Sequence, residues 1–364
     1  MNTVAVPAEA SASIASAGVA TATRGGAATR GTIEPIQHLR AVAAIGVAFH
    51  HSIAQVYGDN GHSFGRLGAA GVDLFFVISG FIMWVTAASR TETPAHFVAK
   101  RLIRIVPLYW LVTTFVVTVV LLKPHLMRSA QFNAWHVAAS YAFIAWPHPK
   151  FTTTFWPVVV PGWTLDYEMF FYAIVAISLT AAMRWRPLII VAALIGLALL
   201  GVTVPPATLA AFYTDPILLE FAFGIVIGLL FTKKISIPGR WAYGLIPVAL
   251  ALFAVAGPLE SDGNRFLCWG LPLALLVYAS INAPTLLPRR TFGLLGDASY
   301  SIYLTQFCTI APAAGLLNSI LHSPAQKVVA TFALVAVAIG GGMVAYYVAE
   351  RPMTEWARKS LATA

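Results

Sequence analysis

The sequence has few charged residues, and this shortage decides its class. Of 364 residues, 23 are Lys or Arg and 14 are Asp or Glu, so only 10% are charged, whereas 59% are hydrophobic. A soluble protein of this length would carry roughly 90 charges. The few charges present cannot cover the surface of a soluble fold. This excludes a soluble enzyme, a nucleic-acid-binding protein and a disordered chain, and indicates a protein embedded in the lipid bilayer.

Acidic residues are scarcer than basic ones, and cysteine is scarcer still. The net charge of +9 would suggest a nucleic-acid partner in a soluble chain, but in a membrane protein it reports the sidedness of loops, so no nucleic acid is expected. The two cysteines, Cys268 and Cys308, lie far apart in apolar stretches. They favour neither a disulfide framework nor a metal site, and no metal is expected.

Long apolar runs fill most of the chain. Residues 1–33, rich in Ala, Ser, Thr and Gly, predict a disordered cytoplasmic tail. About 20 apolar residues span a bilayer as a helix. Residues 34–352 therefore predict an all-α membrane domain with about ten transmembrane helices, followed by a short cytoplasmic tail at 353–364. The expected spans are 36–57, 69–88, 105–123, 163–183, 187–204, 216–232, 241–258, 266–283, 298–321 and 326–349.

When these spans are assigned, most of the basic residues fall on one side of the membrane. With a cytoplasmic N-terminus, 17 of the 23 fall in inner segments and 6 in outer ones. This predicts that both termini are cytoplasmic. The loop at 124–162 is then outside, and its Trp, Tyr and Phe side chains suit either stacking on sugar rings or an interfacial belt.

The first span carries an arginine and two histidines. Arg40 and His51 are eleven residues apart, which is 1100° on a helix, so both face the same side and lie about 16.5 Å apart along the axis. His50 is turned away by about 80°. His51 is therefore the preferred candidate base, although a histidine here can also serve only as a hydrogen-bonding partner of a neighbouring helix.

Two carboxylates enter the membrane from the predicted outer side. Asp73 lies early in the second span and Glu168 early in the fourth. Beside His51 either would fix the tautomer of the ring and make it more basic, as a general base requires. The alternative for both is a role at the interface or in helix packing. Asp166 is expected to be solvated.

Cationic residues lie at the opposite side. Arg101 and Arg104 share a helix face just before the third span, at the level of Arg40. Guanidinium groups bind phosphates in bidentate fashion. The alternative is that these charges only set topology and contact lipid headgroups.

Seven short stretches then point to one family. They are LRAVAAIGVAFHH (39–51), GVDLFFVISGF (71–81), RLIRIVP (101–107), WTLDYEMFFY (163–172), LLEFAFGIVIG (218–228), LGDASYSIYL (295–304) and YYVAERP (346–352). In this order they resemble the integral-membrane acyltransferase-3 family, nearest to its exopolysaccharide acetyltransferase members.

The resemblance implies a ten-helix enzyme of the cell inner membrane. It takes an acyl group, usually acetyl, from cytoplasmic acyl-CoA and passes it to a sugar hydroxyl of an envelope or extracellular glycan or its lipid-linked precursor. The family's motifs fall on Arg40 and His51, on Arg101 and Arg104, and on Glu168. One departure is Gln306, where the family commonly has His near this position, and glutamine cannot titrate near neutral pH.

Two other functions remain open from the sequence. A transporter or flippase of a glycan or small solute has similar hydropathy, although no inverted repeat is visible. An acyltransferase acting on a small molecule is the second.

Overall fold

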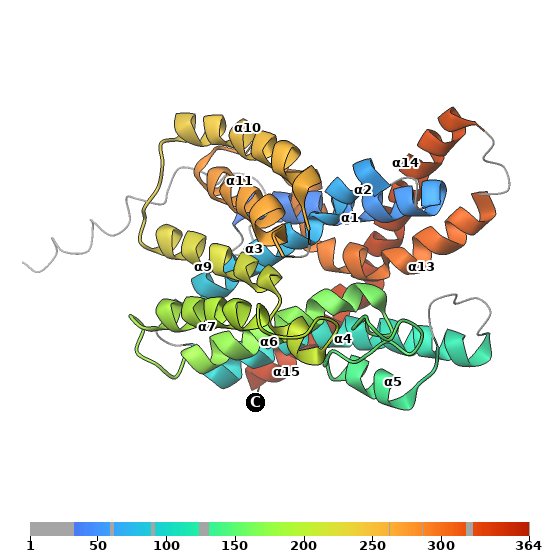
Figure 1. Cartoon of the computed structure of the whole chain (residues 1–364), viewed down its shortest axis with the longest axis horizontal. Helices are drawn as coiled ribbons and strands as arrows, with labels where there is room; N and C mark the ends of the chain where they lie inside the picture. Colours follow the sequence, from blue (N-terminus) through green and yellow to red (C-terminus); the bar gives the residue numbers. More distant parts are fainter. Residues whose placement is uncertain are drawn as a thin grey trace, which may run out of the picture. The chain divides into compact units, whose positions relative to one another are not determined.

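The computed structural model describes residues 33–58, 62–88, 92–123, 131–261, 263–285, 287–317 and 323–363. The predicted tail at 1–33 lies outside these ranges except for Ile33. The described chain is helical and contains no β-strand, as the sequence predicts. Figure 1 shows the helices, which in chain order are α1 (Glu34–Tyr57), α2 (His62–Ala69), α3 (Gly71–Ala87), α4 (Pro94–Leu122), α5 (Ala134–Tyr141), α6 (Trp163–Ser178), α7 (Arg186–Gly201), α8 (Leu209–Tyr213), α9 (Leu219–Thr232), α10 (Gly239–Ala256), α11 (Leu271–Asn282), α12 (Arg289–Asp297), α13 (Ser299–Leu317), α14 (Pro324–Ala345) and α15 (Arg351–Thr363).

Six helical segments in the described ranges are long and apolar enough to cross a membrane. Two shorter apolar helices, Arg186–Gly201 and Phe266–Asn282, accompany them. All eight coincide with predicted spans, so the chain is a multi-pass membrane protein. The count of ten and the side of each terminus stay predictions. The six segments are Glu34–Tyr57, Gly65–Ala87, Pro94–Leu122, Leu209–Thr232, Gly239–Leu259 and Pro324–Ser360.

Local sequence signals set where several helices begin. The Thr93 hydroxyl accepts a hydrogen bond from the His96 backbone N–H at 3.3 Å, and a proline follows at the first helical position of α4. Ser323 and Gln326 form a capping box at the start of α14. Such caps satisfy backbone donors that the first helical turn leaves unpaired.

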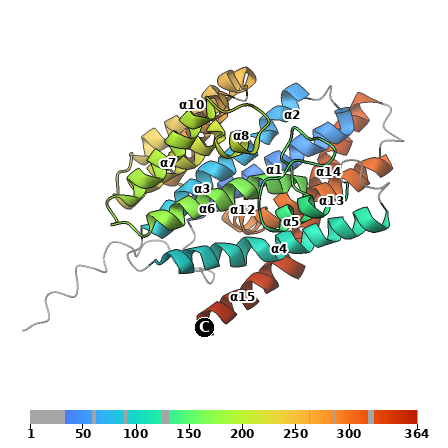
Figure 2. The same ribbon diagram turned by 60° about the horizontal axis from the view of Figure 1, so that its bottom comes forward.

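Helix α1 is the central helix of the fold. It packs against α2, α3, α12, α13 and α14 (Figures 1 and 2). Small side chains let helices approach closely in a membrane. The polar residues of α1 therefore lie within reach of several other helices. The small residues buried on α1 are Ala41, Ala43, Ala44 and Ala48.

Glycines allow α3 and α9 to touch through their backbones. A Cβ atom at Gly80 would overlap the carbonyl oxygen of Phe221, and one at Gly224 would overlap that of Val77. Any larger side chain would push the two helices apart. The sequence predicts this role for the pair Gly224 and Gly228, and Gly228 likewise contacts Trp84 closely.

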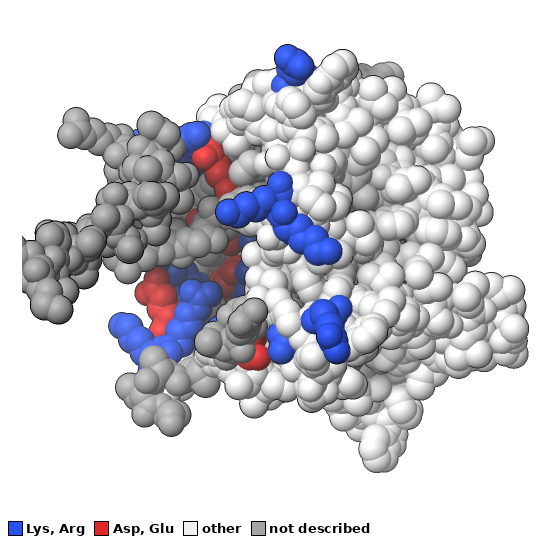
Figure 3. Space-filling model, turned by 90° about the vertical axis from the view of Figure 1, so that its left-hand side faces the viewer, with Lys and Arg blue, Asp and Glu red and all other residues white. Residues whose placement is uncertain are grey.

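The described residues of the predicted C-terminal tail are helical. Helix α14 continues through a π-helical turn at Tyr346–Glu350 into α15, which packs against α4 (Figure 2). The segment Pro324–Ser360 has 37 residues. This corresponds to about 55 Å of helix, longer than a hydrocarbon core of about 30 Å, so its end extends past the hydrocarbon. Figure 3 shows charged side chains over the left and central parts of one face, whereas the right-hand part of that face is free of them.

Candidate active site

A narrow slot lies between α1, α3, α4, α6 and α13. Its volume is about 90 Å³, which is room for roughly six water molecules. Val72 and Met83 both line it and are eleven residues apart on α3, so the slot extends about 16.5 Å along that helix. Its long, thin shape suits an extended chain. Its polar lining residues are Arg40, Ser79, Arg101, Arg104, Thr164, Glu168, Tyr172, Ser299, Tyr300 and Tyr303.

The structure brings the three predicted arginines together in this slot. Arg40 comes from α1 and is 7% exposed, whereas Arg101 and Arg104 come from successive turns of α4. The Arg101 Nη2 atom donates to the Thr86 hydroxyl at 3.1 Å, and its Nε atom has no partner. Within the described ranges, Arg104 makes no hydrogen bond and none of the three has a carboxylate within 4.0 Å. Guanidinium groups held together without direct counterions form a strong anion site.

Glu168 shares the slot with these arginines. Ser79 and Tyr172 lie beside its carboxyl group, and the charges of Arg104 and Arg40 act on it. The sequence places Glu168 beside His51, in the outer half of the membrane. In the structure it lines the slot with the arginines instead, because α6 packs against α3 and α4, which carry the slot's other lining residues.

His51 lies on α1 about three turns beyond Arg40 and does not line the slot. Its ring is half-buried, and its centroid is 5.1 Å from that of His50. His50 is the only ionisable neighbour among the described residues that acts on His51 electrostatically. The His50 Nδ1 atom is 2.8 Å from the Gly65 carbonyl oxygen, a contact between α1 and α2. Within the described ranges His51 makes no hydrogen bond, whereas the His50 ring does.

Asp73 is paired with an arginine rather than placed beside His51. Its two carboxylate oxygens accept hydrogen bonds from Arg265 Nε at 2.8 Å and Nη2 at 2.9 Å. Asp73 is fully buried, and the guanidinium group of Arg265 lies over the Trp269 ring, 4.6 Å from its centroid. A third acidic residue, the fully buried Glu220, adjoins both and has no hydrogen-bond partner in the described part of the chain. Asp73 thus belongs to a buried cluster that joins α3, α9 and the segment just before the π-helical turn Phe266–Gly270, which leads into α11.

Asp166 corrects a second expectation. The sequence suggests a solvated side chain, but Asp166 is 1% exposed and neither carboxyl oxygen finds a partner within the described ranges. It lies in the first turn of α6, with Tyr109 close by. The expectation was wrong because α4 covers this end of α6.

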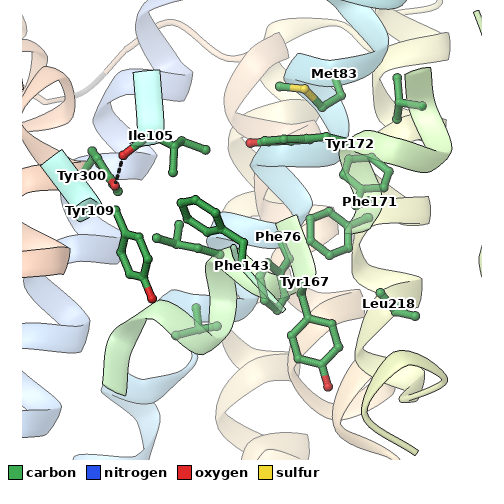
Figure 4. Close-up of a cluster of buried hydrophobic side chains, with 14 of the residues drawn as sticks. Phe76, Met83, Ile105, Tyr109, Phe143, Tyr167, Phe171, Tyr172, Leu218 and Tyr300 are labelled. Atoms are coloured by element: carbon green, nitrogen blue, oxygen red, sulfur yellow. Dashed lines mark hydrogen bonds between the residues drawn. The ribbon is translucent and has the colours of Figure 1, made fainter. Parts of the chain in front are cut away.

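Sequence reasoning missed the hydroxyl groups of the slot. Tyr172, Tyr300 and Tyr303 all line it, and the Tyr300 hydroxyl donates to the Ile105 carbonyl oxygen at 2.8 Å, which fastens α13 to α4 (Figure 4). The Tyr303 hydroxyl donates to the Pro161 carbonyl oxygen at 3.0 Å. Both tyrosines of α13 belong to the stretch LGDASYSIYL, so that motif was the available signal.

Gln306, the departure noted in the same stretch, is fully buried. Its amide nitrogen donates to the Tyr303 carbonyl oxygen at 3.0 Å, and its amide oxygen has no partner in the described residues. The described part of the chain holds no group of three or more His, Cys, Asp or Glu side chains that could bind a metal ion.

Comparison with known proteins gives the family. The sequence matches the acyltransferase 3 family, described as an acyltransferase domain, over residues 34–347. The chain belongs to the acyltransferase 3 family. It is 38% identical over 312 residues to exopolysaccharide production protein ExoZ of Rhizobium meliloti (strain 1021), covering 84% of this chain and 95% of ExoZ. It is 28% identical over 323 residues to acyltransferase MdmB of Streptomyces mycarofaciens, covering 79% of this chain and 81% of MdmB. No solved structure matches the chain.

Membership in this family confirms the resemblance inferred from the seven motifs. The acyltransferase 3 match covers α1 to α14 and the start of the π-helical turn, and so includes every residue that lines the slot. The chain is therefore a membrane acyltransferase, and the slot is its candidate active site.

Proposed function

We propose that this acyltransferase is an O-acetyltransferase of an exopolysaccharide or a related envelope glycan. It takes acetyl from cytoplasmic acetyl-CoA, or acyl from another acyl-CoA, at the cell inner membrane. The glycan hydroxyl, on the polymer or on its lipid-linked precursor, is the acceptor. The observation that carries the proposal is the slot itself: three arginines with no carboxylate within 4.0 Å among the described residues lie in one part of a long, narrow cavity. Helix α1, which carries Arg40, also carries His51 about three turns farther along.

The donor binds through its phosphates. Arg104 has the guanidinium group most open to a ligand, with Arg101 and Arg40 beside it. Arg40 and His51 are about 16.5 Å apart along α1, so a donor held by its phosphates needs a long, thin arm to bring the thioester near His51. Coenzyme A has such an arm. Glu168 orients the Ser79 and Tyr172 hydroxyl groups beside it around the donor.

His51 is the general base of the transfer. It takes the proton of the acceptor hydroxyl, whose oxygen attacks the thioester carbon. The new C–O bond forms, the C–S bond breaks, and the leaving thiolate takes the proton from His51. In a two-step variant His51 carries the acetyl group itself between donor and acceptor. Asp73, paired with Arg265, has no chemical step in this scheme.

The test is the acetyl content of the host glycan. Mass spectrometry of glycan from a strain lacking this protein is expected to show loss of O-acetyl groups. Reintroducing the wild-type protein is expected to restore the O-acetyl groups of the glycan. The control variant Lys233→Ala, whose exposed side chain lies away from the slot, is expected to restore them as well. His51→Ala protein that inserts normally is expected to leave the glycan without O-acetyl groups.

The same experiment separates the two alternatives. Unchanged acetylation in the deletion strain, together with a missing acetylated small molecule, would favour a small-molecule acceptor. Movement of a labelled solute without acetyl transfer would favour a transporter. Membership in an acyltransferase family supports the enzyme over the transporter.

A further inference from the structure

We propose that Gln37 and Asp297 are positioning residues that hold the Arg40 guanidinium group in the donor slot. The inference rests on the proposed function, since it assigns Arg40 to the phosphates of the donor. It concerns two residues that do not line the slot themselves and that act only through Arg40.

Two hydrogen bonds connect the three side chains. Gln37 Nε2 donates to Asp297 Oδ1 at 2.9 Å, and Arg40 Nη1 donates to Gln37 Oε1 at 3.1 Å. A carboxylate only accepts hydrogen bonds and a guanidinium group only donates them. The glutamine amide must therefore turn its nitrogen toward Asp297 and its oxygen toward Arg40. Only this one orientation satisfies both neighbours, so Asp297 fixes the amide, and the amide fixes Arg40.

The backbone holds this arrangement at a close contact between α12 and α1. A Cβ atom at Gly296 would overlap the Gln37 carbonyl oxygen, so the residue before Asp297 must be glycine for the helices to approach this far. Ser299 and Tyr300, which follow Asp297 closely in sequence, line the slot. One short stretch of chain thus both fixes Arg40 and forms a wall of the site.

The interposed amide also keeps the charge of Arg40 available. Asp297 acts on Arg40 only from a distance, and Arg40 has no carboxylate within 4.0 Å among the described residues. A carboxylate in direct contact would compete with a phosphate for the same N–H groups. A neutral amide orients the guanidinium group without that competition. Gln37→Glu would place a competing carboxylate at this position.

The effect is expected in donor affinity and not in the chemical step. In the purified full-length protein, Gln37→Ala and Asp297→Ala are expected to raise the KM for acetyl-CoA about fivefold to tenfold, with kcat within twofold of wild type. Gln37→Glu is expected to raise the KM for acetyl-CoA further. Asp297→Asn keeps an acceptor oxygen at the same place and is expected to retain most of the wild-type affinity. Glu355→Ala, which removes an exposed acid on α15, is the matched control.

A truncated donor distinguishes positioning from general damage. Acetyl-pantetheine lacks the nucleotide phosphates, so its KM is expected to be the same in Gln37→Ala as in wild type. Equal loss with both donors, or a fall in kcat alone, would show that these residues only support packing and would overturn the inference. Unchanged KM for acetyl-CoA in all variants would also overturn it while leaving the proposed function standing. A wild-type protein that neither binds nor uses coenzyme A thioesters would refute both.

Discussion

The buried cluster of Asp73, Arg265 and Glu220 gives a prediction about stability that also decides the role of Asp73. Asp73→Asn removes the carboxylate that accepts both hydrogen bonds of Arg265. The guanidinium group, whose side chain is 23% exposed, then remains among α3, α9 and α11 without its direct counterion. We expect the protein to lose stability and to keep its chemistry, because Asp73 does not line the slot.

The expected magnitude follows from burial. Breaking a buried ion pair by removing one partner costs about 3–5 kcal/mol. Glu220 lies close enough to act on Arg265 and can compensate in part, so Asp73→Asn is expected at about 3 kcal/mol, the lower end of that range. Glu220→Gln alone removes a buried carboxyl group that has no hydrogen-bond partner in the described residues, and is expected to cost less than about 1 kcal/mol. The double variant is expected to cost about 5 kcal/mol, which exceeds the sum of the two single costs, so the two changes are not additive.

The assay is unfolding of the detergent-purified protein, followed by acetyl transfer measured well below the unfolding midpoint. The two single variants and the double variant form a cycle with wild type. Additive costs would refute the reasoning about Glu220. An Asp73→Asn protein with wild-type stability and no acetyl transfer would show that Asp73 takes part in the chemistry, contrary to the structural role assigned here.

Three further predictions follow from the site and its surroundings. Arg104→Ala is expected to weaken acetyl-CoA binding by one to two orders of magnitude, because a hydrogen bond to a charged group contributes about 1.5–3 kcal/mol, and isothermal titration against a Lys233→Ala control measures this. Gly224→Leu is expected to abolish stable insertion, since its side chain meets the α3 backbone, whereas Gly196→Leu, with open space around it, is expected to be tolerated when folded protein is assayed by gel filtration. Burial lowers the pKa of His136 below its ordinary 6.5, so the unfolded chain binds more protons than the folded one in mildly acidic solution. The free energy of unfolding is therefore expected to fall as pH drops below 6.5. His136→Gln is expected to flatten the pH dependence of the melting temperature.

Much of the fold follows from composition and apolar runs, since a bilayer requires helices about 20 residues long. The meeting of the arginines could also be predicted, because Arg40, Arg101 and Arg104 lie near the inner ends of their predicted spans. Topology assigns each residue to a side of the membrane, and these three lie on the same side.

Neighbours across the bundle could not be predicted in the same way. Asp73 and Arg265 are 192 residues apart, and no local pattern pairs them. The sequence predicts Glu168 beside His51 because the predicted topology puts both in the outer half of the membrane, but the side of the membrane alone gives neither the depth nor the lateral position of a residue. Gly71, the first residue of α3, closely approaches the Ala43 carbonyl oxygen near the middle of α1. Asp73 therefore lies nearer the level of Ala43 than that of His51 along α1.

The most direct test of the account is acetyl transfer by purified protein from labelled acetyl-CoA to the host exopolysaccharide. Wild-type protein is expected to label the glycan with an ester that mild base removes. His51→Ala protein that inserts and folds normally is expected to transfer no label above background. Transfer at the wild-type rate by His51→Ala, or no transfer by the wild-type protein, would contradict the account.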